Sequence, residues 1–264
     1  MKSWLRIPLS LNSLRKALGY GTFFSAIKQD YHIELLDSLP SGKILVIAPH
    51  PDDDIFGAGG TLAKASPGEV VVAYLCDGSG GVKEGRDEAG QVQRRDPRLI
   101  EARRAEAKAA GEILGYKEQI FFGYPDGKLA SGSAANQAMV DLIQRVKPDI
   151  IFVPSFLDNH PDHRVANEIL VNALSSRDVD FNGEIWAYEI WTPIWPNRII
   201  KINDAIELKK KAIATQKSQL QTRGYEKAIL GLNQFRAEIN NLDGFAEGFF
   251  ACQAKVYEKL YRKS

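Results

Sequence analysis

The chain of 264 residues has little sulfur and little net charge: two cysteines, two methionines, and 34 Lys and Arg against 33 Asp and Glu. The cysteines, Cys76 and Cys252, lie far apart in the sequence and give no basis for a disulfide framework or a cysteine-based zinc site. A net charge of +1 argues against the concentrated basic surface that nucleic-acid binding requires. We therefore expect no nucleic-acid partner.

Long apolar runs are also missing. No segment reaches the roughly 18 consecutive apolar residues expected of a membrane-spanning helix, so we expect no transmembrane segment. The first residues mix apolar and basic side chains, but Arg6 and Pro8 interrupt the run that a signal peptide would need. We predict a cytoplasmic protein in which residues 1–40 form a helical N-terminal extension. Such a helix could dock on the body, join the subunits of a homo-oligomer or lie on a membrane surface.

Residues 41–264 alternate short apolar runs with helical patterns and are predicted to form a single domain. We expect strands at residues 43–49, 70–76, 119–124, 149–154 and 184–191. We expect helices at residues 57–66, 96–115, 134–146 and 165–174. The strand segments are largely apolar, which is typical of strands buried on both faces of a parallel sheet. The sequence therefore predicts an α/β fold with a mainly parallel, doubly wound (Rossmann-like) sheet.

Three of the four histidines, His50, His160 and His163, stand beside Pro-Asp pairs, each just after a predicted strand. Ligands of doubly wound folds bind beyond the carboxyl ends of strands. Either motif alone could form an ordinary turn. However, the three aspartates at 52–54 would repel one another unless a cation compensated them. Two histidines and one carboxylate, with a position left open, form a recurring catalytic zinc site, so the clusters together predict a divalent metal.

These motifs resemble the PIG-L-like zinc-dependent N-deacetylases, which remove acetyl groups from N-acetylglucosamine units of small molecules. The resemblance covers most of residues 43–255, and the phrase Pro-His-Pro-Asp-Asp is most similar to the diacetylchitobiose deacetylase branch. Besides the two motifs it includes Asp77-Gly78, Arg103 with Glu106, Leu114-Gly115, Pro125-Asp126-Gly127, Lys147-Pro148-Asp149, Lys210 to Ile213 with Ser218-Gln219, and Ala246 to Phe249.

The resemblance implies that His50, Asp53 and His163 bind Zn²⁺, although such donors accept other divalent metals. Two residues depart from the family pattern. Asp54 replaces the usual glutamate, which shortens a supporting side chain. Asp158 stands where some members carry a tyrosine that contacts the reacting centre, so a partner for the oxyanion is left unassigned.

The resemblance also implies roles for five further residues. Asp52 would be the general base for the attacking water, and a charged His160 would stabilise the oxyanion and pass a proton to the leaving amine. Asp162 would orient a neighbouring imidazole. Arg103 and Asp126 would hold the sugar. Alternatively, Arg103 could pair on the helix surface with the glutamate three residues later, and Asp126 could be a turn former.

Other features admit simpler interpretations. The glycines at 57–60 and 78–81 match no nucleotide-binding pattern, and the first group is expected to form a turn that enters a helix. The lysines at 209–211 are expected to form a solvated helix face. Four aromatic residues lie close together in the sequence: Trp186, Tyr188, Trp191 and Trp195. They could form a wall against which a sugar ring stacks, or they could pack in the core or in a subunit interface.

The sequence thus predicts a zinc-dependent hydrolase that removes an acetyl group from an N-acetylglucosamine-type amino sugar or its conjugate. A small N-acetylated sugar would be its partner. Two alternatives stay open: a metal-dependent amidase of a non-sugar amide, and a metal-binding protein without turnover. The second alternative would keep the metal ligands without needing Asp52.

Overall fold

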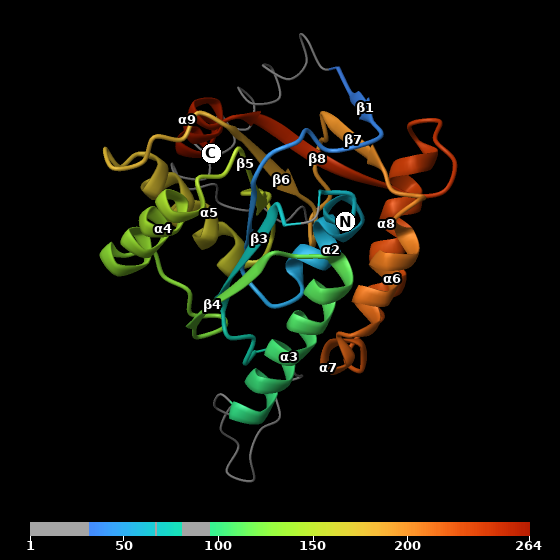
Figure 1. The fold of residues 1–264 in the computed structure, drawn as a ribbon, viewed down its shortest axis with the longest axis horizontal. Coiled ribbons are helices and arrows are strands. Elements are labelled where there is room, and N and C mark those ends of the chain that lie inside the picture. The colour runs from blue at the N-terminus through green and yellow to red at the C-terminus, as the bar shows by residue number, and fades with distance from the viewer. Residues whose placement is uncertain (1–31, 67, 81–95) are drawn as a thin grey trace, which may run out of the picture.

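The computed structural model describes residues 32–66, 68–80 and 96–264, in which an eight-stranded sheet lies between two layers of helices (Figure 1). The strands are β1 (Glu34–Leu36), β2 (Ile44–Ala48), β3 (Val70–Cys76), β4 (Glu118–Tyr124), β5 (Ile150–Pro154), β6 (Glu184–Tyr188), β7 (Arg198–Lys201) and β8 (Ala246–Gln253). The helices are α2 (Asp53–Leu62), α3 (Pro97–Leu114), α4 (Ser133–Val146), α5 (Pro161–Leu174), α6 (Ile206–Ala214), α7 (Lys217–Leu220), α8 (Tyr225–Glu238) and α9 (Ala254–Lys263).

Five strands, in the spatial order β4-β3-β2-β5-β6, run parallel to one another. In the centre of this block, Val46 of β2 pairs with Val72 of β3 and with Phe152 of β5. Every residue of β2, β3 and β5 is buried, because helices cover both faces of the sheet. The predicted mainly parallel α/β sheet is confirmed.

The other edge of the sheet has the order β6-β8-β7-β1, and β8 runs antiparallel to both of its neighbours. These three additional strands were not predicted. Strand β1 lies within the segment 1–40 that was predicted as an extension, and its Leu35 pairs with Ile199 of β7. The helix predicted in that extension falls on residues 1–31, outside the described residues, so the domain boundary stays a prediction.

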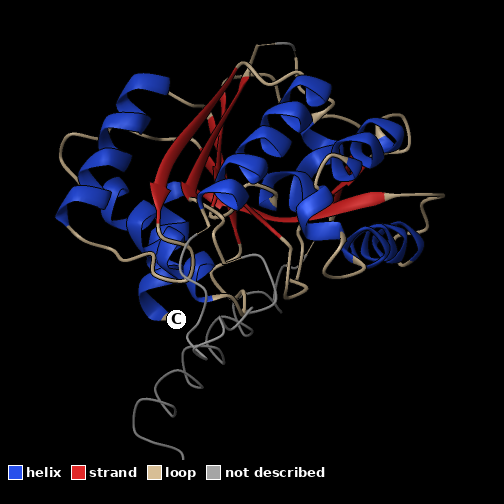
Figure 2. Ribbon diagram, turned by 90° about the horizontal axis from the view of Figure 1, so that it is seen from below, coloured by secondary structure: helices blue, strands red, loops and turns tan. Residues whose placement is uncertain are grey.

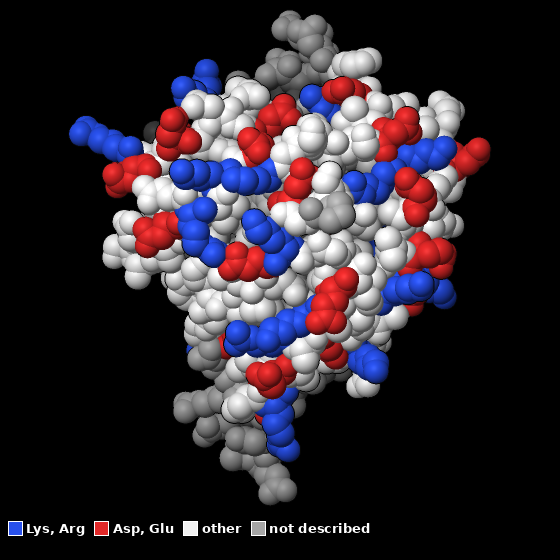
Figure 3. All heavy atoms as spheres, viewed as in Figure 1, with Lys and Arg blue, Asp and Glu red and all other residues white. Residues whose placement is uncertain are grey.

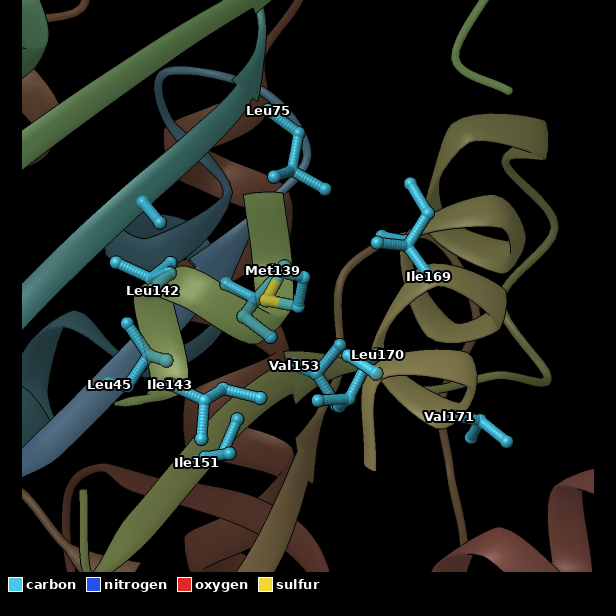
Figure 4. Packing of buried hydrophobic residues seen from close by; sticks show 14 of the residues in the cluster. Leu45, Leu75, Met139, Leu142, Ile143, Ile151, Val153, Ile169, Leu170 and Val171 are labelled. Atoms are coloured by element: carbon cyan, nitrogen blue, oxygen red, sulfur yellow. The ribbon is translucent and has the colours of Figure 1, made fainter. Parts of the chain in front are cut away.

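Helices α4, α5 and α9 pack on one face of the sheet, and α2, α3 and α6 pack on the other (Figure 2). On the first face, Met139 of α4 and Leu170 of α5 lie against Leu45, Ile151 and Val153 of the strands (Figure 4). Each such side chain contributes about 1.5–3 kcal/mol when fully buried. The packed core therefore fixes the strand ends from which the histidine motifs project.

The outer surface carries mixed charge. On the face shown in Figure 3, Lys and Arg side chains are interspersed with Asp and Glu. Within the described residues, no helix has both the length and the apolar character needed to cross a bilayer.

Two helices begin earlier than the sequence pattern predicted. Helix α2 starts at Asp53 rather than at residue 57, so the glycines at 57–60 lie inside the helix and not in a turn before it. A Cβ atom at Gly57 would come within 2.2 Å of the Tyr188 ring, and one at Gly60 within 2.6 Å of Ile202. These glycines therefore permit close packing of α2 against the sheet. Helix α5 starts at Pro161, a residue whose fixed φ suits a first helical position.

Candidate metal centre and active site

The two histidine motifs meet at one edge of the sheet because β2 and β5 are adjacent and parallel. Helix α2 begins just after the first motif and helix α5 begins within the second. The ring centroids of His50 and His160 are 4.7 Å apart, those of His160 and His163 are 4.8 Å apart, and those of His50 and His163 are 5.4 Å apart. The fourth histidine, His32, is exposed. The fold thus gathers the three motif histidines in one place.

The carboxylate of Asp53 lies between two of these rings. Its Oδ2 is 3.1 Å from His50 Nδ1 and 3.2 Å from His163 Nε2. All three residues are at least nine-tenths buried. Neither ring nitrogen of His163 has a hydrogen bond of good geometry among the described residues, which is unusual for a buried polar group. Two buried imidazoles and one carboxylate with unsatisfied donor atoms fit a divalent ion such as Zn²⁺.

Two other groupings could also hold an ion. Ligand atoms of the three motif histidines lie within 4.8 Å of one another, and so do those of His50, Cys76 and Asp162. Burial raises the pKa of the Cys76 thiol, which lies 3.6 Å from Asp162 Oδ2, and a protonated thiol is a poor ligand. Cys76 could not be singled out from the sequence, because an isolated cysteine matches no zinc motif.

The charges at this centre are strongly coupled. Burial by itself raises the pKa of Asp53, but the adjacent rings of His163 and His50 hold it well below its ordinary value. Burial lowers the pKa of His163, whereas Asp53 and Asp158 more than offset this and raise it to about 9. Burial and nearby carboxylates act in the same opposed way on His50, and its pKa is raised. Without a cation, these groups therefore favour a carboxylate between imidazolium ions.

Asp52 is the N-cap residue of α2, yet its side chain caps no backbone amide among the described residues. Its Oδ2 instead lies 3.0 Å from the Arg103 guanidinium. Burial raises the pKa of Asp52, Arg103 lowers it, and the charge of Asp53 raises it, with a net increase. A carboxylate whose pKa is shifted toward neutrality is suited to general-base chemistry.

Arg103, which α3 carries, is 2% exposed and binds inward. Besides Asp52, it lies 3.7 Å from Asp126 Oδ2 and donates to the carbonyl oxygen of Gly78 at 3.0 Å. The alternative of a surface pair with Glu106 is wrong. The Glu106 carboxylate instead accepts hydrogen bonds from the backbone amide and the hydroxyl of Ser218 in α7. Arg103 is therefore part of the buried charge network around Asp52.

Asp126, just after β4, connects Arg103 to the histidines. Its Oδ1 is 3.3 Å from His50 Nε2, and its Oδ2 accepts the amide of Gly80. Burial raises the pKa of Asp126, but His50 and Arg103 lower it to about 2. The carboxylate therefore stays ionised and does more than form a turn.

Asp162 and Asp158 lie behind the histidines. Asp162 Oδ2 is 3.2 Å from His50 Nε2 and accepts the amide of Gly127 at 2.7 Å, an arrangement that can orient the His50 ring. Asp158 Oδ1 is 3.3 Å from His163 Nδ1, and its Oδ2 accepts the amide of Trp191. Asp158 therefore supports a candidate ligand from the side away from Asp53 and has contacts unlike those expected of an oxyanion donor.

His160 is half-buried and is the N-cap residue of α5, where its Nδ1 accepts the amide of Asp162 at 3.2 Å. This bond leaves Nε2 as the nitrogen that carries the ring proton. Burial and the charges of His50 and His163 lower the pKa of His160. These surroundings disfavour the charged form of His160, and in a neutral ring with this Nδ1 contact the donor is Nε2.

A cavity of about 630 Å³ adjoins this centre. Its lining includes residues of both motifs together with Phe56, Trp191, Arg223 and Tyr225. Tyr225 is the first residue of α8, and Arg223 lies in the turn before that helix. Trp191 is 41% exposed, and its ring meets that of Tyr225 at a centroid distance of 5.6 Å. Tyr225 and Arg223 could not be singled out from the sequence, because no motif surrounds them.

The four aromatic residues considered together in the sequence separate in the structure. Trp186 and Tyr188 are fully buried in β6, so their place is in the core. Strand β6 ends at Tyr188, short of residue 191, and the carboxylate of Glu189 then accepts the amide of Ile194. This turn places Trp191 in the cavity lining, while Trp195 is not among the lining residues.

Comparisons with known proteins point to one family. The family model described as GlcNAc-PI de-N-acetylase matches residues 45–174. A diacetylchitobiose deacetylase of Thermococcus kodakarensis is 31% identical over 193 residues, which cover 67% of this chain and 70% of the relative. A probable N-acetyl-alpha-D-glucosaminyl L-malate deacetylase 2 of Bacillus cereus is 28% identical over 209 residues, which cover 76% and 90%.

The chain is also similar to a solved structure and to a relative whose name describes a different activity. The structure of N,N'-diacetylchitobiose deacetylase from Pyrococcus horikoshii aligns with a TM-score of 0.68 at 22% identity and covers 97% of both chains. A 4-oxalmesaconate hydratase of Pseudomonas putida is 27% identical over 139 residues, about half of either chain (51% and 52%). Relatives of this chain therefore carry more than one activity, and the residues of the site decide between them.

Proposed function

Because the chain belongs to the PIG-L family of GlcNAc-PI de-N-acetylases, we propose that it is a zinc-dependent hydrolase that removes an acetyl group from an N-acetylglucosamine-type amino sugar or its conjugate. The observation that carries this proposal is the position of Asp53 Oδ2 between ring nitrogens of His50 and His163, with Asp52 beside it on the same cavity. Asp53 and the two histidines can bind an ion, and Asp52 can act as a base beside it.

His50, Asp53 and His163 would hold the ion, with Asp162 and Asp158 fixing the two rings from behind. A bound Zn²⁺ supplies a Lewis acid that polarises the amide carbonyl and makes water more acidic. These two effects are the ones that an unactivated amide requires.

Asp52 would accept a proton from the water whose oxygen attacks the acetyl carbonyl carbon. Its contact with Arg103 fixes the direction of the carboxylate, and burial keeps its pKa above the ordinary value. The carbon–nitrogen bond then breaks, the nitrogen takes up a proton, and the products are acetate and a free amine. General-base catalysis of this kind contributes about 10²–10⁴-fold to the rate.

His160 would donate from Nε2 to the oxygen that becomes negative as water adds. Its Nδ1 bond to the Asp162 amide holds the ring in that tautomer, so no rearrangement is needed during the reaction. A donor aimed at a developing oxyanion contributes on the order of 3 kcal/mol. Because a neutral His160 has its proton on Nε2, this role does not require the ring to be charged.

The sugar would lie in the cavity between the charged centre and the aromatic side. Asp126 would accept a hydrogen bond from a sugar hydroxyl, and Arg103, which also lines the cavity, would contact the sugar beside it. Trp191 would cover an apolar face of the sugar or of its aglycone. This assignment uses the exposed aromatic surface next to the otherwise polar site.

Acetate release across a panel of N-acetylglucosamine conjugates, with and without a chelator, tests the proposal. We expect chelator-sensitive release that returns when Zn²⁺ is added back. Release from simple non-sugar amides alone would favour an amidase, and hydration of an unsaturated acid without acetate release would favour the chemistry of the hydratase relative. A protein that binds zinc but turns over none of these compounds would contradict an enzymatic role. A cytoplasmic location and a homo-oligomeric state are also proposed, each to be measured directly.

A further inference from the structure

Helix α2 presents Asp52 and Asp53 at its beginning, but its own sequence is poorly suited to hold them. Three of its ten residues are glycine, a residue with low helix propensity. Gly57 and Gly60 serve close packing, as their contacts with Tyr188 and Ile202 show. Something outside the helix must therefore supply the rigidity that a catalytic carboxylate and a metal ligand require.

A fully buried ion pair contacts this helix. Lys209 of α6 and Glu247 of β8 are 0% exposed at their side chains, and Lys209 Nζ lies 2.5 Å from Glu247 Oε1. The expectation that lysines 209–211 form a solvated face is wrong for Lys209, although Lys211 is exposed. No step of the proposed mechanism uses either member of the pair.

The ion pair is joined to both sides of one turn of α2. Lys209 Nζ donates to the carbonyl oxygen of Phe56 at 3.1 Å, and Glu247 Oε1 accepts the amide of Gly60 at 2.9 Å. In a regular α-helix this carbonyl and this amide would bond to each other. Glu247 Oε2 also accepts the amide of Thr61 at 2.7 Å. The two charged side chains thus supplement the hydrogen-bond ladder of the helix at its glycine-rich turn.

The connection continues toward the candidate active site. The amide of Phe56, whose carbonyl is bound by Lys209, donates to the carbonyl oxygen of Asp52 at 3.0 Å. Phe56 itself lines the cavity. One residue therefore separates the ion pair from the backbone of the proposed base.

We propose that Lys209 and Glu247 are positioning residues, which fix the turn of α2 that presents Asp52 and Asp53 to the second histidine motif. The inference rests on the proposed zinc-dependent function. A buried ion pair is weak support for stability, since apolar replacements are often equally stable. A positioning role explains why charges are placed in this helix contact.

The test uses the full chain with Lys209→Met and Glu247→Gln combined, so that no unpaired charge stays buried. Zinc affinity is measured by competition with a chromophoric chelator, and kcat and KM are measured for acetate release. We expect a folded protein whose zinc affinity is about 10- to 100-fold lower, the range typical of groups that support metal ligands. We expect kcat to fall and KM to stay near the parental value.

Lys64→Met is the matched control. Lys64 also anchors the end of α2, through Asp204 at 2.8 Å and the carbonyl of Lys201 at 2.9 Å, but it lies beyond the last helical residue and away from Asp52. Its loss should leave zinc affinity and kcat unchanged.

Parental zinc affinity and kcat in the double variant would overturn the positioning role. If the double variant does not fold, the Lys209→Arg variant is measured instead, because it keeps the positive charge and changes its geometry. Parental zinc affinity and kcat in that variant would also overturn the positioning role. A parent chain that binds no zinc or releases no acetate would instead contradict the proposed function. The two failures are therefore distinguishable.

Discussion

The same tripeptide, His-Pro-Asp, stands at the start of helices α2 and α5, but it is placed differently relative to the first helical residue. In α2 the aspartate is the N-cap residue and the helix starts after it, whereas in α5 the histidine is the N-cap residue and the helix starts at the proline. His50 therefore stands before its helix, while His163 lies in the first turn of the other helix. The N-cap position thus differs by two residues between the motifs. The first motif offers His50, which precedes its helix, to the candidate metal centre, and the second offers His163, which lies inside its helix.

The two aspartates at the same motif position also differ. Asp52 is buried beside Arg103 and Asp53, and its pKa is raised. Burial acts on Asp162 in the same direction, but hydrogen bonds from His50 and the Gly127 amide lower its pKa. The surroundings of each carboxylate, and not the motif, therefore decide which aspartate can exchange a proton and which stays a fixed anion.

The largest effect is expected for His163→Ala. This change removes a buried imidazole that faces Asp53 at 3.2 Å, so we expect the loss of bound zinc and a fall of acetate release by more than about 10³-fold. Metal analysis of the purified variant, together with its circular dichroism, checks this. A variant with parental zinc content would show that the second motif does not supply this ligand.

His160→Ala should separate the two histidines of α5. We expect zinc to stay bound and kcat to fall about 10²- to 10³-fold, because a donor to the oxyanion is lost. Steady-state kinetics and zinc content measured on the same sample are needed. Zinc loss here would favour the alternative ligand set of three histidines.

Asp158→Asn probes the support behind His163. The carboxylate lies 3.3 Å from His163 Nδ1, and its replacement by an amide weakens the orientation and basicity of that ring. We expect zinc affinity to fall about 10- to 100-fold. Chelator competition measures the affinity, with Asp178→Asn on the exposed surface as the matched control. Equal affinities for the two variants would contradict the support role.

The smallest effect is a proton release on zinc binding. Because carboxylates raise the pKa of His163 to about 9, the metal-free ring is protonated at pH 7.5, and it must be neutral to bind a metal. Zinc affinity should therefore rise with pH up to about 9 and fall as the solution is acidified. Calorimetric titration in buffers of different ionisation enthalpy reports the protons released. A binding heat independent of the buffer would contradict this charge state.

The parallel half of the sheet could be predicted because its strands are continuous apolar runs, as in Val70–Cys76. The antiparallel edge could not. Strand β1 has three residues, none of them buried, and β8 contains a buried charge, Glu247, that breaks the apolar pattern. Among the described residues, the partners of the Glu247 carboxylate are all distant in the sequence: Lys209 in the ion pair, and the backbone amides of Gly60 and Thr61.

The grouping of the candidate ligands at one edge of the sheet was also predictable, because their residue types and motifs are local. The surroundings of Arg103 and Trp191 were not. Arg103 looks like any helix arginine until the loop at Gly78 and the carboxylate of Asp52 are placed beside it. Trp191 reaches the cavity because the chain turns at Glu189, a turn fixed by the distant Arg236.

The role of Asp52 as the base is tested by the zinc content and acetate release of Asp52→Asn, measured on one preparation. The amide can still accept a hydrogen bond from Arg103 but cannot take a proton from water. We predict one zinc per chain and acetate release lowered by about 10²- to 10⁴-fold. A variant that keeps its zinc and hydrolyses as fast as the parent would contradict the assignment of Asp52 as the base.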